Sequence, residues 1–281
     1  MDNKIEVKNL HKKFDHFTLG ENSFSIPKGY ITGFIGKNGM GKTSTIKAIL
    51  SLINYEGKIY VDGDDVKSLD YLQDVGIIMD DSLLSKDWTL NSVNDAMNIG
   101  YNNWQEDVFF DYLNRFGLDK NSKVKDLSRG MNIKLMLSIA LSHKANLLIL
   151  DEPTSGLDPS MRDELSDILQ EFVADEDNTV LFSTHITQDL DRIADFIIFI
   201  DHGKIIFSDT KEAFQEKYIV VKGGIEDFDL LKDVKILGGK KLAHNFEALV
   251  ERDKFNVDSD ELVIEEPNID RVMVLYGRSR I

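Results

Sequence analysis

Residues 36–44 read Gly-Lys-Asn-Gly-Met-Gly-Lys-Thr-Ser, and this stretch decides the fold. It matches the phosphate-binding loop G-x-x-x-x-G-K-[ST], whose glycines bring backbone N–H groups close to an anion. An apolar stretch, residues 31–35, precedes the loop, and a helical stretch, residues 45–52, follows it. Because the motif functions between a strand and the N-terminus of a helix, this context predicts an α/β nucleotide-binding domain. A glycine-rich turn with a chance lysine is the weaker interpretation.

The loop offers the groups that a polyphosphate with its magnesium ion needs. Its backbone N–H groups and the positive end of the following helix attract phosphate oxygens, and Lys42 adds a point charge along the β- and γ-phosphates. The Thr43 hydroxyl is a suitable ligand for Mg²⁺. The predicted nucleotide-binding residues of the loop are Gly36, Asn38, Gly39, Gly41, Lys42, Thr43 and Ser44.

A second motif is the apolar run 147–150, which ends in Asp151-Glu152-Pro153. Such a run suits a parallel strand that is covered on both faces. Two adjacent carboxylates at its end are costly without a cation or a reactant nearby, although a satisfied structural pair is the weaker alternative. We therefore predict that Asp151 holds the metal through water and that Glu152 accepts hydrogen bonds from the attacking water.

His185 ends the next predicted strand, residues 179–184. A lone histidine is more often a loop or core residue than a catalytic one. However, ligands of open α/β sheets gather at the carboxyl ends of the strands, where Asp151 and Glu152 also lie. His185 is therefore a third candidate for the active site.

Composition limits the partners of the chain. The 281 residues include 33 basic and 49 acidic side chains, for a formal net charge of -16. A nucleic-acid-binding protein presents a basic face, so no nucleic-acid partner is expected. The absence of cysteine excludes disulfides and thiolate metal sites. Residues 1–8 are unlike a signal peptide and the apolar runs have only strand length, so we expect an intracellular chain that reaches a membrane through another protein.

The remaining patterns divide the chain into parts. Residues 5–26 alternate as short antiparallel strands, and residues 82–142 have a helical pattern rich in aromatic side chains. A new pattern of strands and a helix begins near residue 217. We expect strands at 218–221 and 262–264 and a helix at 269–276. The glycine pairs in Lys222-Gly223-Gly224 and Gly238-Gly239 are expected to interrupt the strands. The predicted domains are 1–216, with a helical insertion at about 82–142, and a small α+β accessory domain at 217–281.

The chain resembles the ATPase subunits of ATP-binding-cassette (ABC) transporters. The resemblance rests on four features in this order: the loop at 36–44, the carboxylate strand at 147–153, Ser155-Gly156-Leu157-Asp158 and His185. The resemblance covers about residues 5–218. Leu127-Ser128-Arg129-Gly130-Met131 stands in the place of the family's signature Leu-Ser-Gly-Gly-Gln. Ser128 and Gly130 match that signature, whereas Arg129 and Met131 depart from it. The implied fold is a P-loop NTPase of the ABC type with an antiparallel β subdomain and a helical insertion.

The resemblance implies that two such domains close head to tail on two ATP molecules, with Mg²⁺ as the metal cofactor. Ser128 and Gly130 of one copy would meet the γ-phosphate held by Lys42 of the other. Asp158 would cross the same interface, and His185 would contact the γ-phosphate.

Two further positions follow from the resemblance. Phe14 is the candidate for stacking on adenine, with Phe17 as the alternative. Where the family has a glutamine that senses magnesium and the membrane subunit, this sequence has Asp80, followed by Asp81. A carboxylate can reach the metal or its water but is shorter and adds negative charge, so we expect altered coupling.

The implied function is an ATP-hydrolysing subunit at the cytoplasmic face of the cell membrane. Its expected partners are a separate integral membrane permease and a second ATPase subunit, which is the same or a related chain. A single cassette with a short tail most resembles bacterial exporters of peptides and antibiotics, including those for bacitracin resistance and phenol-soluble modulins. The predicted cargo is therefore an amphipathic or antimicrobial peptide.

The sequence leaves open two other functions and the role of three aromatic side chains in the insertion. A soluble ABC ATPase that acts on ribosomes or DNA usually has two cassettes and a basic surface. A regulatory module would bind ATP without hydrolysing it. In the insertion, Trp88, Tyr101 and Trp104 either line the groove that receives a short helix of the membrane subunit or fill the insertion's own core.

Overall fold

The computed structural model describes residues 2–79 and 84–278. Contacts between described residues divide the chain into two units. The first comprises Met1–His185 and Ile193–Ser208, and the second comprises Ile186–Arg192 and Asp209–Ile281. The second unit thus includes a short helix from the middle of the chain, which the sequence patterns did not suggest.

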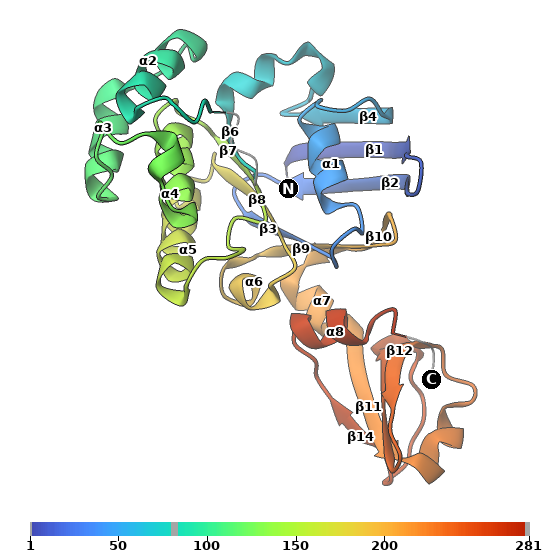
Figure 1. The fold of residues 1–281 in the computed structure, drawn as a ribbon. Coiled ribbons are helices and arrows are strands. Elements are labelled where there is room, and N and C mark those ends of the chain that lie inside the picture. Colours follow the sequence, from blue (N-terminus) through green and yellow to red (C-terminus); the bar gives the residue numbers. More distant parts are fainter. Residues whose placement is uncertain (1, 80–83, 279–281) are drawn as a thin grey trace. The chain divides into compact units, whose positions relative to one another are not determined.

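A six-stranded sheet forms the centre of the first unit, with strand order β10-β9-β3-β8-β7-β6 (Figure 1). β3 lies parallel to β8 and β9, and β7 lies parallel to β6 and β8. Every residue of β3, β7 and β8 is buried, as the apolar runs predict. The strands are β3 (Ile31–Ile35), β6 (Val75–Ile78), β7 (Leu147–Asp151), β8 (Thr179–Thr184), β9 (Phe196–Asp201) and β10 (Lys204–Thr210).

The predicted antiparallel subdomain is a second sheet of the same unit, with strand order β2-β1-β4-β5. Its strands are β1 (Asn3–Lys13), β2 (Thr18–Pro27), β4 (Glu56–Val61) and β5 (Asp64–Asp65). Side chains from this sheet, from α1 (Lys42–Ile49) and from β3 and β7 form one apolar core. Burial of that core fixes the direction in which α1 leaves the phosphate loop.

The insertion contains α2 (Leu90–Gly100), α3 (Glu106–Arg115) and α4 (Arg129–Leu141). α4 packs against β6, and α3 packs against α4 (Figure 1). α5 (Pro159–Val173) follows β7. Short 3₁₀ turns occupy Val66–Ser68, Asp70–Asp74 and Val124–Asp126. Within the described ranges, no helix is both long enough and apolar enough to cross a bilayer.

The second unit is an α+β structure with the antiparallel strand order β12-β13-β11-β14. The strands are β11 (Tyr218–Gly224), β12 (Ile236–Lys241), β13 (Asn245–Glu251) and β14 (Val263–Glu265). The helices are α6 (Thr187–Ile193), α7 (Lys211–Lys217) and α8 (Ile269–Leu275), with 3₁₀ turns at Ile225–Leu231 and Arg252–Lys254. An apolar cluster that includes Val221, Phe246 and Val250 fills the unit.

The glycine pairs of this unit are not breaks, so that expectation was wrong. Gly223 and Gly224 lie inside β11, and Gly238 and Gly239 lie inside β12. A Cβ atom on Gly223 would come within 2.9 Å of the Phe246 ring, and one on Gly238 would overlap the backbone of α8. These glycines therefore permit close packing inside paired strands, the other common reason for glycine in a strand.

Candidate active site

The loop between β3 and α1 has the backbone that an anion site requires. Gly39 and Gly41 have φ values of +79° and +111°, in the left-handed region that favours glycine. Gly41 precedes α1, where no side chain caps the helix N-terminus, so first-turn N–H groups are available for an anion. A Cβ atom on Gly36 would lie 2.6 Å from the Ile200 carbonyl oxygen, whereas one on Gly39 would meet no atom of the described residues within 4 Å. Gly36 is thus required for packing, and Gly39 faces open space.

Lys42, Thr43 and the end of β7 meet beside this loop. The Lys42 ammonium is buried, donates to the Gly36 carbonyl at 2.7 Å and lies 3.0 Å from Glu152 Oε1. The Thr43 hydroxyl donates to Asp151 Oδ2 at 2.7 Å. The other oxygen of Asp151 accepts a short hydrogen bond from the Ser183 hydroxyl. The sequence-predicted residues of the loop and of the carboxylate strand are therefore brought together.

Glu152 has a strained backbone and a firmly held side chain. Its φ of +52° lies in the left-handed region, which costs a non-glycine residue about 1–3 kcal/mol. His185 Nδ1 lies 2.6 Å from Glu152 Oε2, and the His185 backbone N–H donates to the same oxygen at 3.3 Å. Oε1 is buried without a hydrogen bond from any described residue, and its contact with Lys42 is purely ionic.

The donor set fits Mg²⁺ held jointly by protein and phosphates. Among the described residues, no cluster of three or more histidine and acidic side chains could hold a metal alone. Magnesium usually takes one or two protein carboxylates together with phosphate oxygens and water. The Thr43 hydroxyl and the Asp151 carboxylate, in direct contact, match that arrangement. The third predicted metal ligand, Asp80, lies outside the described residues, as does Asp81.

The signature segment lies against the chain that leads into α5. Ser128 caps α4 by accepting the Met131 N–H at 3.3 Å, and Asp158 caps α5 by accepting the Met161 N–H at 3.0 Å. A Cβ atom on Gly130 would lie 3.1 Å from the Met161 side chain, so a larger residue there would crowd α5. Ser128 and Asp158 thus each cap the start of a helix.

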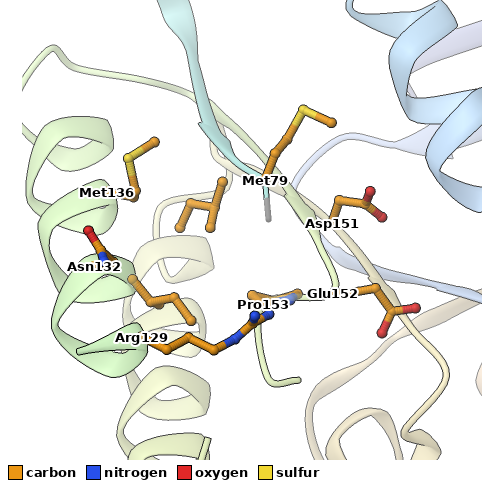
Figure 2. A pocket seen from close by; sticks show the side chains of 9 residues that line it. Met79, Arg129, Asn132, Met136, Asp151, Glu152 and Pro153 are labelled. Carbon is orange, nitrogen blue, oxygen red and sulfur yellow. The ribbon is translucent and has the colours of Figure 1, made fainter. Parts of the chain in front are cut away.

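Arg129, which departs from the signature, borders a pocket of about 290 Å³ beside the carboxylates. Figure 2 shows its side chain extending from α4 towards Pro153, while the carboxylates of Asp151 and Glu152 point away from α4. Its Cδ atom is 3.3 Å from the place of a Cβ atom on Gly156. Arg129 therefore fills space between the signature helix and the turn after Glu152.

The two candidates for adenine stacking differ in their surroundings. Their ring centroids are 6.0 Å apart. Phe17 packs against the apolar core and would lie 3.0 Å from a Cβ atom on Gly41. Phe14 is half-buried, as is Phe17, but it lies outside that core, and the Lys12 ammonium is 5.7 Å from its ring centre. Because Phe17 packs beside Gly41 and in the core, Phe14 is the better candidate for stacking on a nucleotide base.

A larger cavity of about 650 Å³, here called the insertion groove, lies between the insertion and the sheet. Its lining reaches from Lys47 and Thr43 to the insertion and is mostly apolar: Leu52, Ile77, Met79, Leu84, Met97, Tyr101, Met136, Ile139 and Ala140, with His143, Asp151 and Glu152. Of the three aromatic candidates, only Tyr101 lines it. Trp104 donates its N–H to Asn94 within the insertion, and Trp88 lines neither described cavity.

Two residues of this region were missed by sequence reasoning. Ser183 holds both carboxylate residues, since its hydroxyl bonds Asp151 and also accepts the Glu152 N–H at 3.2 Å. Ser183 pairs with Asp151 in the parallel register of β7 and β8, and its place near the end of the predicted strand 179–184 could have indicated this role. His143 is fully buried at the end of α4, with its ring stacked on Tyr101 at 4.0 Å. Burial lowers the pKa of His143, and nothing in its sequence context indicated that burial.

The site has the features of a P-loop nucleoside triphosphatase. A glycine-rich loop joins a strand to a helix, and a Thr–Asp contact and a glutamate lie at the carboxyl ends of parallel strands.

A model of the ABC transporter family matches residues 19–155. The lantibiotic transport ATP-binding protein SrtF of Streptococcus pyogenes is 34% identical over 225 residues, which cover 76% of this chain and 95% of that protein. The Nod factor export ATP-binding protein I of Burkholderia lata is 31% identical, with 76% and 73% covered.

A solved structure of an ATP-binding subunit of an ABC transporter superposes with a TM-score of 0.67 at 25% identity, covering 75% of this chain and 91% of the other. The chain therefore belongs to the family of ABC transporter ATP-binding proteins. This family binds ATP and hydrolyses it to power transport. Its ATP-binding subunits work with membrane permease components and usually dimerise. The predicted fold and ATPase activity are thus confirmed.

Proposed function

We propose that this chain is the ATPase subunit of an exporter and that Glu152 is the general base of its hydrolytic reaction. The observation that carries the proposal is the fixed position of the Glu152 carboxylate between His185 and Lys42. A base must be held within hydrogen-bond reach of the attacking water, and two contacts to Oε2 from His185 restrict the rotamers of Glu152.

The other residues divide the remaining tasks. Lys42 and the loop N–H groups bind the phosphates, and Lys42 exchanges its contact with Glu152 for a phosphate oxygen. Thr43 and Asp151 would hold Mg²⁺, which supplies charge neutralisation on the phosphates when bound. His185 orients Glu152 and donates to the γ-phosphate. The ring of Phe14 stacks on the adenine base.

Glu152→Gln tests the role of the base. The amide keeps the size of the side chain and its contact with His185 but cannot accept a proton, so turnover should fall by about 100-fold or more. ATP binding, measured by equilibrium titration, should stay within a few-fold of the parent chain. Glu171→Gln, which changes an exposed glutamate paired with Arg115, is the matched control and should retain turnover. Full turnover by Glu152→Gln would remove Glu152 from this role.

We also propose a composite site made by two ATPase subunits, the second being the same or a related chain. Within one chain, Ser128 and Asp158 are engaged with the first turns of their own helices. N–H groups at the start of α4 and the hydroxyl of Ser128 form a ready anion site for the γ-phosphate of an opposite copy. Gly130 in the first turn lets that phosphate approach the backbone.

The insertion groove is the proposed docking site for a short helix of a separate membrane permease, which would place the chain at the cytoplasmic face of the cell membrane. The groove is lined by apolar side chains that include three methionines, and methionine adapts to varied partner surfaces. It also reaches Thr43, Asp151 and Glu152, so a docked helix would lie beside the reacting groups.

Met97→Glu tests this docking, because it places a charge in the apolar lining. We expect the variant to be lost from washed native membranes while its ATPase activity in solution is retained. The matched control, Asn98→Glu, adds the same charge at an exposed position of the same helix and should leave membrane association unchanged. Equal association of both variants would contradict docking in the groove.

The proposed cargo is an amphipathic or antimicrobial peptide. Support comes from the relative named for lantibiotic transport and from a second relative named for export. Because cargo is bound by the permease, the test is to purify the chain from solubilised native membranes and identify the membrane protein that remains bound. Sensitivity of a strain lacking this chain to added lantibiotics, compared with its parent, then tests the peptide class; unchanged sensitivity and peptide secretion would contradict it.

A further inference from the structure

The helix that follows His185 belongs to the second unit by its contacts. The chain passes from the first unit to the second after His185 and returns before Ile193. α6 begins at Thr187, so one residue, Ile186, separates the helix from the histidine. Whatever holds α6 therefore also limits where the backbone of His185 can lie.

Both ends of α6 are held by elements near the C-terminus. At its first turn, the buried Thr187 hydroxyl donates to Asp270 Oδ1 of α8 at 3.3 Å. Near its last turn, the Asp191 carboxylate accepts the Ile269 N–H, and the Asp191 carbonyl accepts from the Lys211 ammonium at 3.2 Å. These contacts join α6 to α7 and α8, which follow it later in the sequence.

α8 is itself well anchored within the second unit. Ile269, Val272, Met273 and Leu275 are buried, and Gly238 of β12 allows the backbone of α8 to approach closely. Asn268 caps the helix by accepting the Arg271 N–H at 2.8 Å. A hydrogen bond from such a helix can hold the start of α6 in one position.

The His185 side chain is 38% exposed, so packing around its ring does little to fix it. Its catalytic geometry depends on the backbone, since the backbone N–H and Nδ1 both contact Glu152 Oε2. We propose that Thr187 and Asp270 are positioning residues for His185, so that the hydrogen bond between them affects the rate of ATP hydrolysis. This inference rests on the role proposed above for His185.

The alternative is that Thr187 only stabilises the second unit. A positioning role predicts a specific kinetic result, because the phosphate loop that binds ATP is untouched while the orientation of His185 changes. Misplacement of a catalytic group by an ångström can reduce the rate by up to about 100-fold without loss of binding. The effect should therefore fall on kcat and not on the KM for ATP.

The test uses steady-state ATPase kinetics of the full chain. Thr187→Val removes the hydroxyl with little change in shape and should lower kcat by about 10-fold, with the KM for ATP within about twofold. Thr187→Ser restores the hydroxyl and should recover most of kcat. Asp270→Ala should reproduce the loss, and the double variant should be no slower than either single variant, because both remove one hydrogen bond.

Two further variants separate the explanations. Ser259→Ala removes a hydroxyl of the same unit that accepts the Glu261 N–H at 3.2 Å, and should leave kcat unchanged. In a His185→Ala background, Thr187→Val should have no additional effect. An equal loss of kcat in Ser259→Ala, or a further loss in the His185→Ala background, would overturn the inference.

The outcomes also distinguish this inference from the proposed function. If His185→Ala loses turnover while Thr187→Val keeps it, the positioning role fails and the role of His185 stands. If His185→Ala keeps full turnover, the role of His185 itself fails, and the positioning role falls with it.

Discussion

The phosphate-loop side and the signature side of the candidate site use their polar side chains differently. Lys42, Thr43, Asp151 and Glu152 contact one another across elements that are far apart in sequence. Ser128 and Asp158 instead bond to N–H groups three residues ahead in their own helices. One side is thus organised by tertiary contacts, whereas the other presents helix N-termini. This difference supports the proposal that the signature side becomes part of a site only with a second chain.

The largest expected effect comes from changing the signature side without unfolding it. Ser128→Asp keeps a good N-cap for α4 but places a carboxylate where the γ-phosphate of an opposite copy would bind. Turnover should fall by about 100-fold, the scale of losing one transition-state contact, while ATP still binds to the intact loop. ATPase rates and ATP titration of the same preparation check this.

Thr89→Asp is the matched control. Thr89 caps α2 in the same way, by accepting the Ser92 N–H at 3.2 Å, and it has no role in the proposed ATP site. Its turnover should equal that of the parent chain. A similar loss in both variants would mean that the helix caps matter for folding only, and the contrast between the two sides would disappear.

An intermediate effect is expected at the two phenylalanines before β2. Phe14→Ala should weaken ATP binding by about 10-fold, since stacking on a base contributes about 1–3 kcal/mol. Its unfolding midpoint in urea should change little, because Phe14 lies outside the apolar core. Phe17→Ala should lower the free energy of unfolding by about 2 kcal/mol and affect ATP affinity less. The reverse pattern would assign stacking to Phe17.

The smallest effect concerns acid sensitivity at His143. Burial lowers its pKa in the folded state, opposed by contacts with the Ile139 and Val75 carbonyls. The unfolded chain therefore binds the proton more tightly, and stability should fall as pH decreases from about 7 through the unfolded pKa of about 6.5. His143→Phe keeps a ring against Tyr101 and removes the contribution of His143 to the dependence of stability on pH.

Urea unfolding at pH 7 and pH 5.5, followed by tryptophan fluorescence, measures this slope. Both tryptophans lie in the insertion of the first unit, so the signal reports the unit that contains His143. His143→Phe should be less stable than the parent chain at pH 7 but should lose less stability on acidification. Equal losses in the two proteins would mean that His143 does not contribute to the acid sensitivity.

Sequence reasoning located the parts of the site that depend on strand ends. β3 and β8 have the bounds predicted for them, because fully apolar runs are local signals. The meeting of Thr43 with Asp151 follows from the loop motif and from the parallel sheet. The site roles assigned to Asp80 and to the signature residues stay predictions.

Other features depend on tertiary contacts that no local pattern encodes. The glycines of β11 and β12 resembled turns, but they make room for Phe246 and α8. The attachment of α6 to the C-terminal unit includes a hydrogen bond between Thr187 and Asp270, which are 83 positions apart in sequence. The strained φ of Glu152 likewise arises from the surrounding strands and has no signal in the sequence.

The most direct test of the central claim is the molecular mass of Glu152→Gln in solution with ATP and Mg²⁺. The account predicts that slow turnover traps the closed state, so the mass doubles when ATP is added, either alone or with a related ATPase chain that copurifies. The double variant Glu152→Gln with Ser128→Asp should bind ATP and keep the monomer mass. A monomer mass for Glu152→Gln with ATP bound, or a doubled mass for both variants, would contradict a site shared between two chains.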